Sequence, residues 1–183
     1  FRRLVRYWQD RDPVLVLCGA GNNGGDGYLV AANAKRHGMD VECVAVAPTG
    51  KLSGDARKAW QKAVVDGVNV REIDALDEVE LEKMFSRAGV LVDAMLGTGV
   101  SGAPREPFSG MIVRCNESKA SVLAIDLPSG LNATTGAAEG DVIRAAMTVT
   151  FIGLKAGLFT GQGPAVCGEV VFESLDTEQG VLK

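Results

Sequence analysis

From residue 13 onward the chain alternates short runs of β-branched and other apolar residues with longer amphipathic stretches. This alternation constrains the fold more than any other feature, because it is typical of βαβ units that assemble into a mainly parallel sheet. The apolar runs predict strands over 14–18, 41–47, 68–73, 90–95, 122–127, 148–152 and 170–172. Helical periodicity predicts helices over 26–37, 53–66 and 76–87. In the second of these, Ser53 is the expected N-cap, and Ala59, Ala63 and Val64 are expected to point inward. The sequence therefore predicts an α/β fold with a mainly parallel central sheet.

The size and composition predict one domain that spans residues 1–183. A chain of 183 residues with 46% hydrophobic residues can close one sizeable core and is short for two. Its formal net charge is −4 and its Lys and Arg residues are scattered, which argues against a nucleic-acid partner. No apolar run approaches the roughly 20 residues that cross a bilayer, and the first residues lack the pattern of a signal peptide. We therefore expect a soluble, cytoplasmic protein without a membrane partner.

The cysteines agree with a reducing compartment. The four are Cys18, Cys43, Cys115 and Cys167. They are far apart, form no C-x-x-C pair and lie mostly in or beside apolar runs, so we expect buried thiols rather than a zinc site or a disulfide framework.

The two ends of the chain suggest a longer protein. The chain begins at Phe1 rather than Met, and Phe1, Leu4, Val5 and Trp8 have helical spacing, so we expect an amphipathic helix whose start is truncated. The tail over 176–183 is polar, and we expect it to begin a linker to a further domain.

A glycine-rich segment follows the first expected strand and reads CGAGNNGGDG. Gly19, Gly21 and Gly24 have the G-x-G-x-x-G spacing of a dinucleotide-binding turn. Glycines let the backbone approach a pyrophosphate, and the unpaired N–H groups at a helix start favour an anion. The alternative is a tight glycine turn with Asn in left-handed conformations and no ligand.

An NAD-dependent dehydrogenase is one explanation of this segment, but the rest of the sequence disfavours it. Such an enzyme needs an acidic residue about 20 positions on to hold the ribose, and residues 45–49 contain none. His37, the only histidine, lies at the far end of the expected helix and is interpreted as a surface residue. Asn22, Asn23 and Asp26 instead add side-chain oxygens among the glycines, which indicates ribose hydroxyls or a cation beside the anion.

Polar segments follow three of the expected strands, and the carboxyl ends of parallel strands share one edge of a sheet. They are the glycine-rich segment, Asp93 with the loop over 97–103, and Asp126 with the turn to Gly130. A carboxylate in an apolar strand is costly unless it is paired, protonated or bound to a cation. Asp93 alone could merely accept from nearby backbone N–H groups. With Asn23 and Ser129 it could instead hold a hard monovalent cation, which leaves Asp126 for acid–base chemistry.

Four motifs in order, NNGGDG, VDAMLGTGVSG, IDLPSGL and FIGLKAGL, resemble the YjeF N-terminal domain family of NAD(P)H-hydrate epimerases. The resemblance implies a Rossmann-like three-layer αβα sandwich. It implies interconversion of the R and S epimers of hydrated NADH or NADPH, a damaged nucleotide that is the substrate and not a cofactor, so that a dehydratase partner can restore it. One potassium ion per chain is implied at Asn23, Asp93 and Ser129. The implied substrate contacts are Asn22, Asn23, Gly24, Gly25, Asp26, Gly97, Thr98, Gly99, Val100, Ser101, Gly102, Ala103 and Asp126.

For catalysis we expect Asp126 to act as general acid and base. Lys155, in the GLKAGL segment, is expected to touch the substrate or tune Asp126, and the alternative is an ordinary solvated lysine. The resemblance also implies a homodimer and a dehydratase that could be fused after residue 183. A non-catalytic scaffold for binding or dimerisation, as in an mRNA-decapping protein that resembles this family, is the alternative function. The polar set at the strand ends favours the enzyme.

Overall fold

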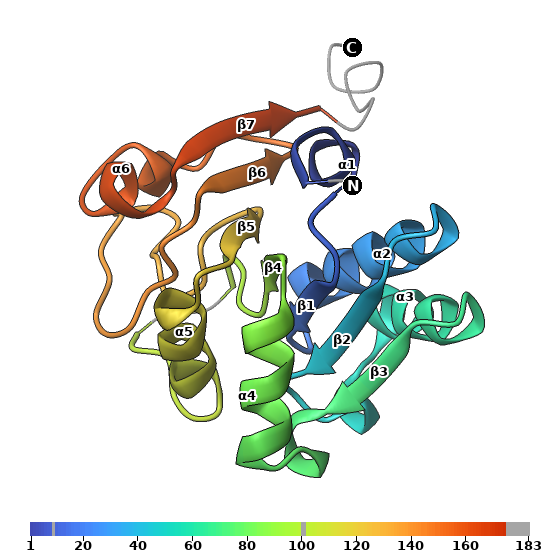
Figure 1. Ribbon diagram of the computed structural model, residues 1–183. Coiled ribbons are helices and arrows are strands. Elements are labelled where there is room, and N and C mark those ends of the chain that lie inside the picture. Colours follow the sequence, from blue (N-terminus) through green and yellow to red (C-terminus); the bar gives the residue numbers. More distant parts are fainter. Residues whose placement is uncertain (9, 100–101, 175–183) are drawn as a thin grey trace.

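The computed structural model describes residues 1–8, 10–99 and 102–174, which form a parallel sheet between two layers of helices (Figure 1). Seven described strands lie in the order β3-β2-β1-β4-β5-β6-β7, and each neighbouring pair is parallel. Their bounds are β1 Val14–Cys18, β2 Val41–Ala45, β3 Asn69–Glu72, β4 Val90–Ala94, β5 Ser121–Ile125, β6 Met147–Phe151 and β7 Glu169–Glu173. The predicted α/β fold, a Rossmann-like αβα sandwich, is confirmed.

The helices divide between the two faces of the sheet. The α-helices are α1 Arg2–Trp8, α2 Asn22–Arg36, α3 Gly54–Val65, α4 Glu78–Arg87, α5 Phe108–Glu117 and α6 Gly163–Val166, and the 3₁₀ turns are η1 Thr49–Lys51, η2 Ile73–Ala75 and η3 Ala156–Leu158. Apolar residues of α1, α2 and α3 share one core cluster, and those of α4 and α5 share another. The termini of the described chain meet where Arg3 of α1 forms an ion pair with Glu173 of β7, at 2.9 Å.

The alternation of side chains along β1 explains why both faces of the sheet are covered. Val14 and Val16 pack against the layer of α2 and α3, whereas Leu15 and Leu17 pack against the layer of α4 and α5. All four are at most 2% exposed. Burial of such a side chain contributes on the order of 1.5–3 kcal/mol, so a strand that is apolar on both faces is stable only between two layers.

Helix α2 begins earlier than predicted, at Asn22 instead of about residue 26. The glycine-rich segment is therefore both the turn and the first helical turn. The reason is close packing of this helix on the sheet. A Cβ on Gly24 would lie 2.0 Å from the Gly19 carbonyl oxygen, and a Cβ on Gly27 would lie 2.5 Å from the Ala94 Cβ.

Two further predictions are corrected. Helix α5 was not predicted, although its Met111, Ile112 and Cys115 are buried. Val64 was expected to point inward but is 47% exposed, because Ala59 and Ala63 take the inner positions of α3. Ser53 lies at the N-cap of α3 as expected, but its side chain makes no capping hydrogen bond.

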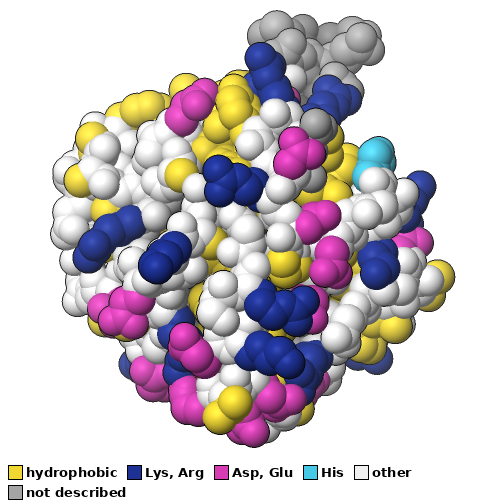
Figure 2. Space-filling model, viewed as in Figure 1, with side chains coloured by type: hydrophobic (Ala, Val, Ile, Leu, Met, Phe, Trp, Pro, Cys, Tyr) yellow, Lys and Arg dark blue, Asp and Glu magenta, His cyan; other side chains and the backbone are white. Residues whose placement is uncertain are grey.

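The surface and the thiols complete the description of the fold. On the face shown in Figure 2, basic and acidic side chains are interspersed, without a broad basic patch. All four cysteines are buried and carry free thiols. In the described ranges of the chain, no helix is long and apolar enough to span a bilayer. The expected linker over 176–183 lies outside the described residues.

Candidate active site

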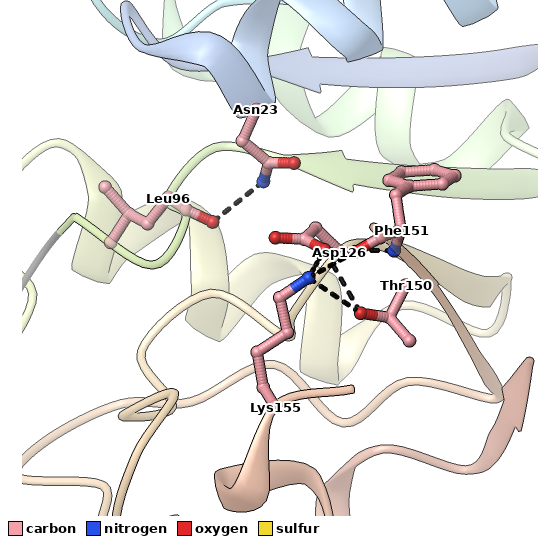
Figure 3. Close-up of polar contacts among 6 residues, drawn as sticks. All are labelled: Asn23, Leu96, Asp126, Thr150, Phe151 and Lys155. Atoms are coloured by element: carbon pink, nitrogen blue, oxygen red, sulfur yellow. Dashed lines mark hydrogen bonds and ion pairs between the residues drawn. The ribbon is translucent and has the colours of Figure 1, made fainter. Parts of the chain in front are cut away.

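The strand order reverses between β1 and β4, which are neighbours in the sheet although β2 and β3 follow β1 along the chain. In open α/β sheets, ligands bind outside the carboxyl ends of the strands at such a point. The start of α2 after β1, the loop after β4, the turn after β5 and the segment after β6 all lie at this edge (Figures 1 and 3). The predicted polar segments are thus brought together.

Asn23 joins α2 to the loop after β4. Its Nδ2 donates to the Leu96 carbonyl oxygen at 2.8 Å, and the residue is 8% exposed. Gly97 allows this approach, because a Cβ on it would lie 3.1 Å from the Asn23 Cβ. The Oδ1 of Asn23 is buried and has no hydrogen-bond partner in the described structure. A buried oxygen without a partner costs about 1–3 kcal/mol, so it indicates the place of a ligand.

Asp93 and Ser129 form a buried network beside the same loop. Asp93 Oδ1 accepts from Ser129 Oγ at 2.6 Å and from Met95 N at 3.2 Å, and its Oδ2 accepts from Ser129 N at 2.8 Å. Ser129 Oγ in turn accepts from Leu96 N at 2.9 Å. Burial raises the pKa of Asp93 from its ordinary 3.8 to about 6, against the opposing effect of these hydrogen bonds. Asp93 therefore does hold backbone N–H groups, as its alternative interpretation supposed.

The donors around Leu96 suit a hard cation. Asn23 and Ser129 both contact the backbone of Leu96, and Asp93 accepts from Ser129 Oγ, so the side-chain oxygens of all three residues lie beside this loop. Oxygen donors are those that hard cations prefer. Asp93 is the single carboxylate among them. In the described ranges no group of three His, Cys, Asp or Glu residues could hold a metal ion.

Asp126 comes directly after β5 in a strained conformation. Its φ is +66°, in the left-handed region that few residues other than glycine adopt. Leu127 N donates to Ile125 O at 2.8 Å and Asp126 N donates to Val149 O at 2.7 Å, which hold this turn. Strain of this kind clusters at functional sites.

Lys155 reaches back from the segment after β6 to Asp126 (Figure 3). Its Nζ forms an ion pair with Asp126 Oδ1 and donates to Thr150 Oγ1 at 3.0 Å and Phe151 O at 2.8 Å. The side chain is 17% exposed, so Lys155 is not the solvated lysine of the alternative interpretation. The chain turns back toward Asp126 at Ile152, which has a φ of +64°. In this turn, Gly153 N donates to Phe151 O at 2.6 Å.

Two residues at this site were missed in the sequence. Thr150 Oγ1 donates to Asp126 Oδ1 at 3.1 Å, and Phe151 N donates to the same oxygen at 3.3 Å. Both lie at the end of β6, which pairs with β5. The signal that could have indicated Thr150 is its place at a strand end five residues before Lys155.

The remaining predicted substrate contacts line the same edge. Asp26 stays exposed, but partial desolvation raises the pKa of its carboxyl, and the negative charge of Asp126 raises it further. Gly97 and Gly102 help to line a hollow between the loop after β4 and the segment after β5. Its other lining residues are Leu96, Leu127, Pro128, Gly130, Leu131, Asn132, Ala137 and Glu139. The predicted contacts Val100 and Ser101 lie outside the described residues, whereas Thr98, Gly99 and Ala103 are exposed in the same loop.

The chain is similar in sequence to a known protein family and to several known proteins. Residues 1–157 match the model of the family described as YjeF-related protein N-terminus. The chain is 44% identical over 174 residues to the bifunctional NAD(P)H-hydrate repair enzyme Nnr of Escherichia coli K12, covering 93% of this chain and 31% of that protein. It is 33% identical over 183 residues to the Coxiella burnetii enzyme of the same name, covering 100% and 36%. The chain thus spans about a third of the length of these relatives.

A solved structure shares the fold. The crystal structure of the yeast protein ynu0 superposes with a TM-score of 0.75 at 19% identity, covering 93% of this chain and 72% of that one.

Proposed function

The chain belongs to the family of YjeF-related protein N-termini, as its four motifs indicated, and on that premise we propose that it is an NAD(P)H-hydrate epimerase. It would interconvert the R and S epimers of hydrated NADH and NADPH. The observation that carries the proposal is the ion pair of Asp126 and Lys155, which lies across the crevice from the start of α2 (Figure 3). The names of the relatives, NAD(P)H-hydrate repair enzymes, support it.

The reaction requires acid–base chemistry and no redox partner. The substrate carbon bears a hydroxyl group beside a ring nitrogen. In one route, protonation of the hydroxyl releases water and leaves an iminium, and water adds again on the other face. In the other route, the ring opens and closes on the other face. Either route gives the second epimer. Asp126 serves as the group that gives and takes the proton. Lys155 holds the carboxylate of Asp126 through its ammonium group, and Thr150 and Phe151 N orient the same oxygen.

The start of α2 and the loop after β4 bind the nucleotide. The first N–H groups of a helix lack partners within it, so the backbone of Asn22, Asn23 and Gly24 is free to face a phosphate. Gly25 and Asp26 continue the contact, together with the loop over 97–103. Gly24 packs so closely on Gly19 that this turn stays near the sheet.

One potassium ion per chain completes the proposed site. Asn23, Asp93 and Ser129 hold it, and the unpartnered Oδ1 of Asn23 supports this assignment. When bound, the ion supplies a positive charge that offsets the buried carboxylate and the phosphates nearby. The family's further properties are proposed with it: a homodimer, a cytoplasmic location and a dehydratase partner fused to the chain, as the length of the relatives suggests.

The alternative functions have less support. A non-catalytic scaffold has no use for a strained aspartate held by a lysine. A dehydrogenase needs a carboxylate after β2 to hold the ribose. The carboxylate of Glu72 reaches this turn, but it already accepts hydrogen bonds from Thr49 N at 2.9 Å and from Thr49 Oγ1.

The test supplies the 183-residue chain with mixed R and S hydrates and a dehydratase specific for the S form. Recovery of the reduced-nicotinamide absorbance from the R fraction measures epimerisation. Asp126→Asn should abolish the recovery and leave nucleotide binding intact, whereas Asp55→Asn, on the exposed face of α3, should behave as wild type. Full activity of Asp126→Asn would remove this residue from the mechanism.

A further inference from the structure

Inversion of a carbon by loss and re-addition of water requires proton transfer on both faces of the ring. The hydroxyl leaves from one face, and water arrives at the other. Asp126 and Lys155 come from the segments after β5 and β6, so both approach the crevice from one side. A second acid–base group should therefore come from the other side, where the start of α2 lies (Figure 3).

Asp26 is the carboxylic acid on that side. Asn23 faces the crevice from α2, opposite Asp126 (Figure 3). Residues three apart in a helix lie on the same side, so Asp26 lies one turn beyond Asn23 toward the crevice. Packing occupies the neighbouring positions of the helix. A Cβ on Gly25 would lie 3.1 Å from the Ala56 Cα, and Gly27, one turn after Asn23, packs on Ala94 of the sheet.

Asp26 and Asp126 have opposite electrostatic surroundings. Asp126 forms an ion pair with a lysine, whereas the described part of the chain gives Asp26 neither a hydrogen bond nor an ion pair. Desolvation and the charge of Asp126 both raise the pKa of Asp26. Two carboxyl groups whose surroundings differ in this way suit one acid and one base.

A second observation, on Asn23, indicates that a bound molecule or ion belongs on this side of α2. The Oδ1 of Asn23 is buried and lacks a hydrogen-bond partner among the described residues, on the same side of the helix as Asp26. Such an oxygen is stabilised when a bound molecule or ion completes its contacts.

We propose that Asp26 is the second acid–base residue of the epimerase and serves the face of the nicotinamide ring opposite to Asp126. This inference rests on the proposed function and deepens it. For one epimer, Asp26 donates its proton to the hydroxyl group, the C–O bond breaks, and the ring nitrogen lone pair forms the C=N bond of an iminium while water leaves. Water on the other face then attacks the carbon, the C=N electron pair returns to nitrogen, and the carboxylate of Asp126 accepts the proton.

The step is balanced and reversible. One proton is given, one is accepted, and no electrons leave the substrate. The other epimer reacts along the same path in reverse, with Asp126 as the acid and Asp26 as the base.

Oxygen-18 water separates this role from simple binding. In labelled water, wild type should invert the hydrate and place the label in the inverted product. Asp26→Asn should slow inversion at least about 100-fold in both directions, the range that general acid–base groups supply. The epimer whose hydroxyl faces Asp126 should still exchange its oxygen, with retention, because that face keeps its catalyst. Asp126→Asn should show exchange in the other epimer alone.

Binding and background measurements complete the experiment. Titration calorimetry with NADP⁺ should show that Asp26→Asn changes the Kd far less than it slows inversion, and Asp26→Glu should recover part of the inversion rate. The rates without protein are subtracted, because hydrates also react slowly in water.

Three results would overturn the role of Asp26. In the first, Asp26→Asn inverts the hydrate as fast as wild type does. In the second, Asp26→Asn loses inversion and oxygen exchange together. In the third, wild type inverts the hydrate without taking up label, which indicates ring opening. An inactive wild type contradicts the proposed function itself and is thereby distinguished from these outcomes.

Discussion

Replacement of the buried Asp93 by asparagine should change how stability depends on pH. In the folded chain the pKa of Asp93 is about 6, against an ordinary value of 3.8, because burial disfavours the charged form. The folded state therefore holds this proton more tightly than the unfolded chain does. The stabilising contribution is fully present below about pH 4 and is lost as the pH rises to about 6. A difference of about two pKa units corresponds to about 3 kcal/mol.

Asparagine removes the titration and adds a cost that does not depend on pH. It has the shape of Asp93 and stays neutral, but its amide group would face the N–H of Ser129, which costs about 1–3 kcal/mol at every pH. The stability of wild type minus that of Asp93→Asn should therefore fall by about 3 kcal/mol between about pH 4 and pH 7.

Urea unfolding in potassium-free choline buffer measures this difference, followed by the fluorescence of Trp8 and Trp60. Asp55→Asn, at an exposed site, is the matched control and should run parallel to wild type. A difference between wild type and Asp93→Asn that stays constant over the pH range would refute the reasoning. Exchange of choline for potassium near pH 7 should stabilise wild type and leave Asp93→Asn unchanged, and equal stabilisation of both would contradict the cation site.

Three further predictions concern the packing of α2 and the ion pair. Gly27→Ala should destabilise the chain by about 1–3 kcal/mol despite the better helix propensity of alanine, because its Cβ meets the sheet, whereas Gly50→Ala, in open space, should be neutral within about 0.5 kcal/mol or slightly stabilising in the same urea assay. Tyr28→Phe removes a buried hydroxyl that has no partner in the described structure, so thermal unfolding should show equal or greater stability, and a loss above about 1 kcal/mol would reveal a hidden partner. Lys155→Met should lower kcat about 100-fold with an unchanged Kd for NADP⁺, and an unchanged kcat would show that the ion pair is only structural.

The sequence was sufficient for the architecture and for the expectation that the polar segments of the candidate site lie together. The switch between apolar runs and amphipathic stretches identifies parallel strands, because both faces of such strands are buried. Parallel strands also bring their carboxyl ends to one edge, so Asn23, Asp93 and Asp126 could be expected to approach one another although about 100 residues separate the first from the last. Helix α5 escaped prediction, because Gly110 interrupts its apolar pattern.

Only the tertiary structure decided which polar atoms meet. The spacing of residues along the sequence does not predict which backbone groups a side chain will contact. The hydrogen bonds of Asn23 and Ser129 depend on the position of the Leu96 backbone. The pairing of Lys155 with Asp126 likewise depends on the strained turn at Ile152, which sends the chain back toward β5. Local patterns of apolar and polar residues predict which strands and helices form, because they indicate which side chains of one element are buried. Distances between elements arise from how closely they pack, and here the glycines of α2 set that closeness.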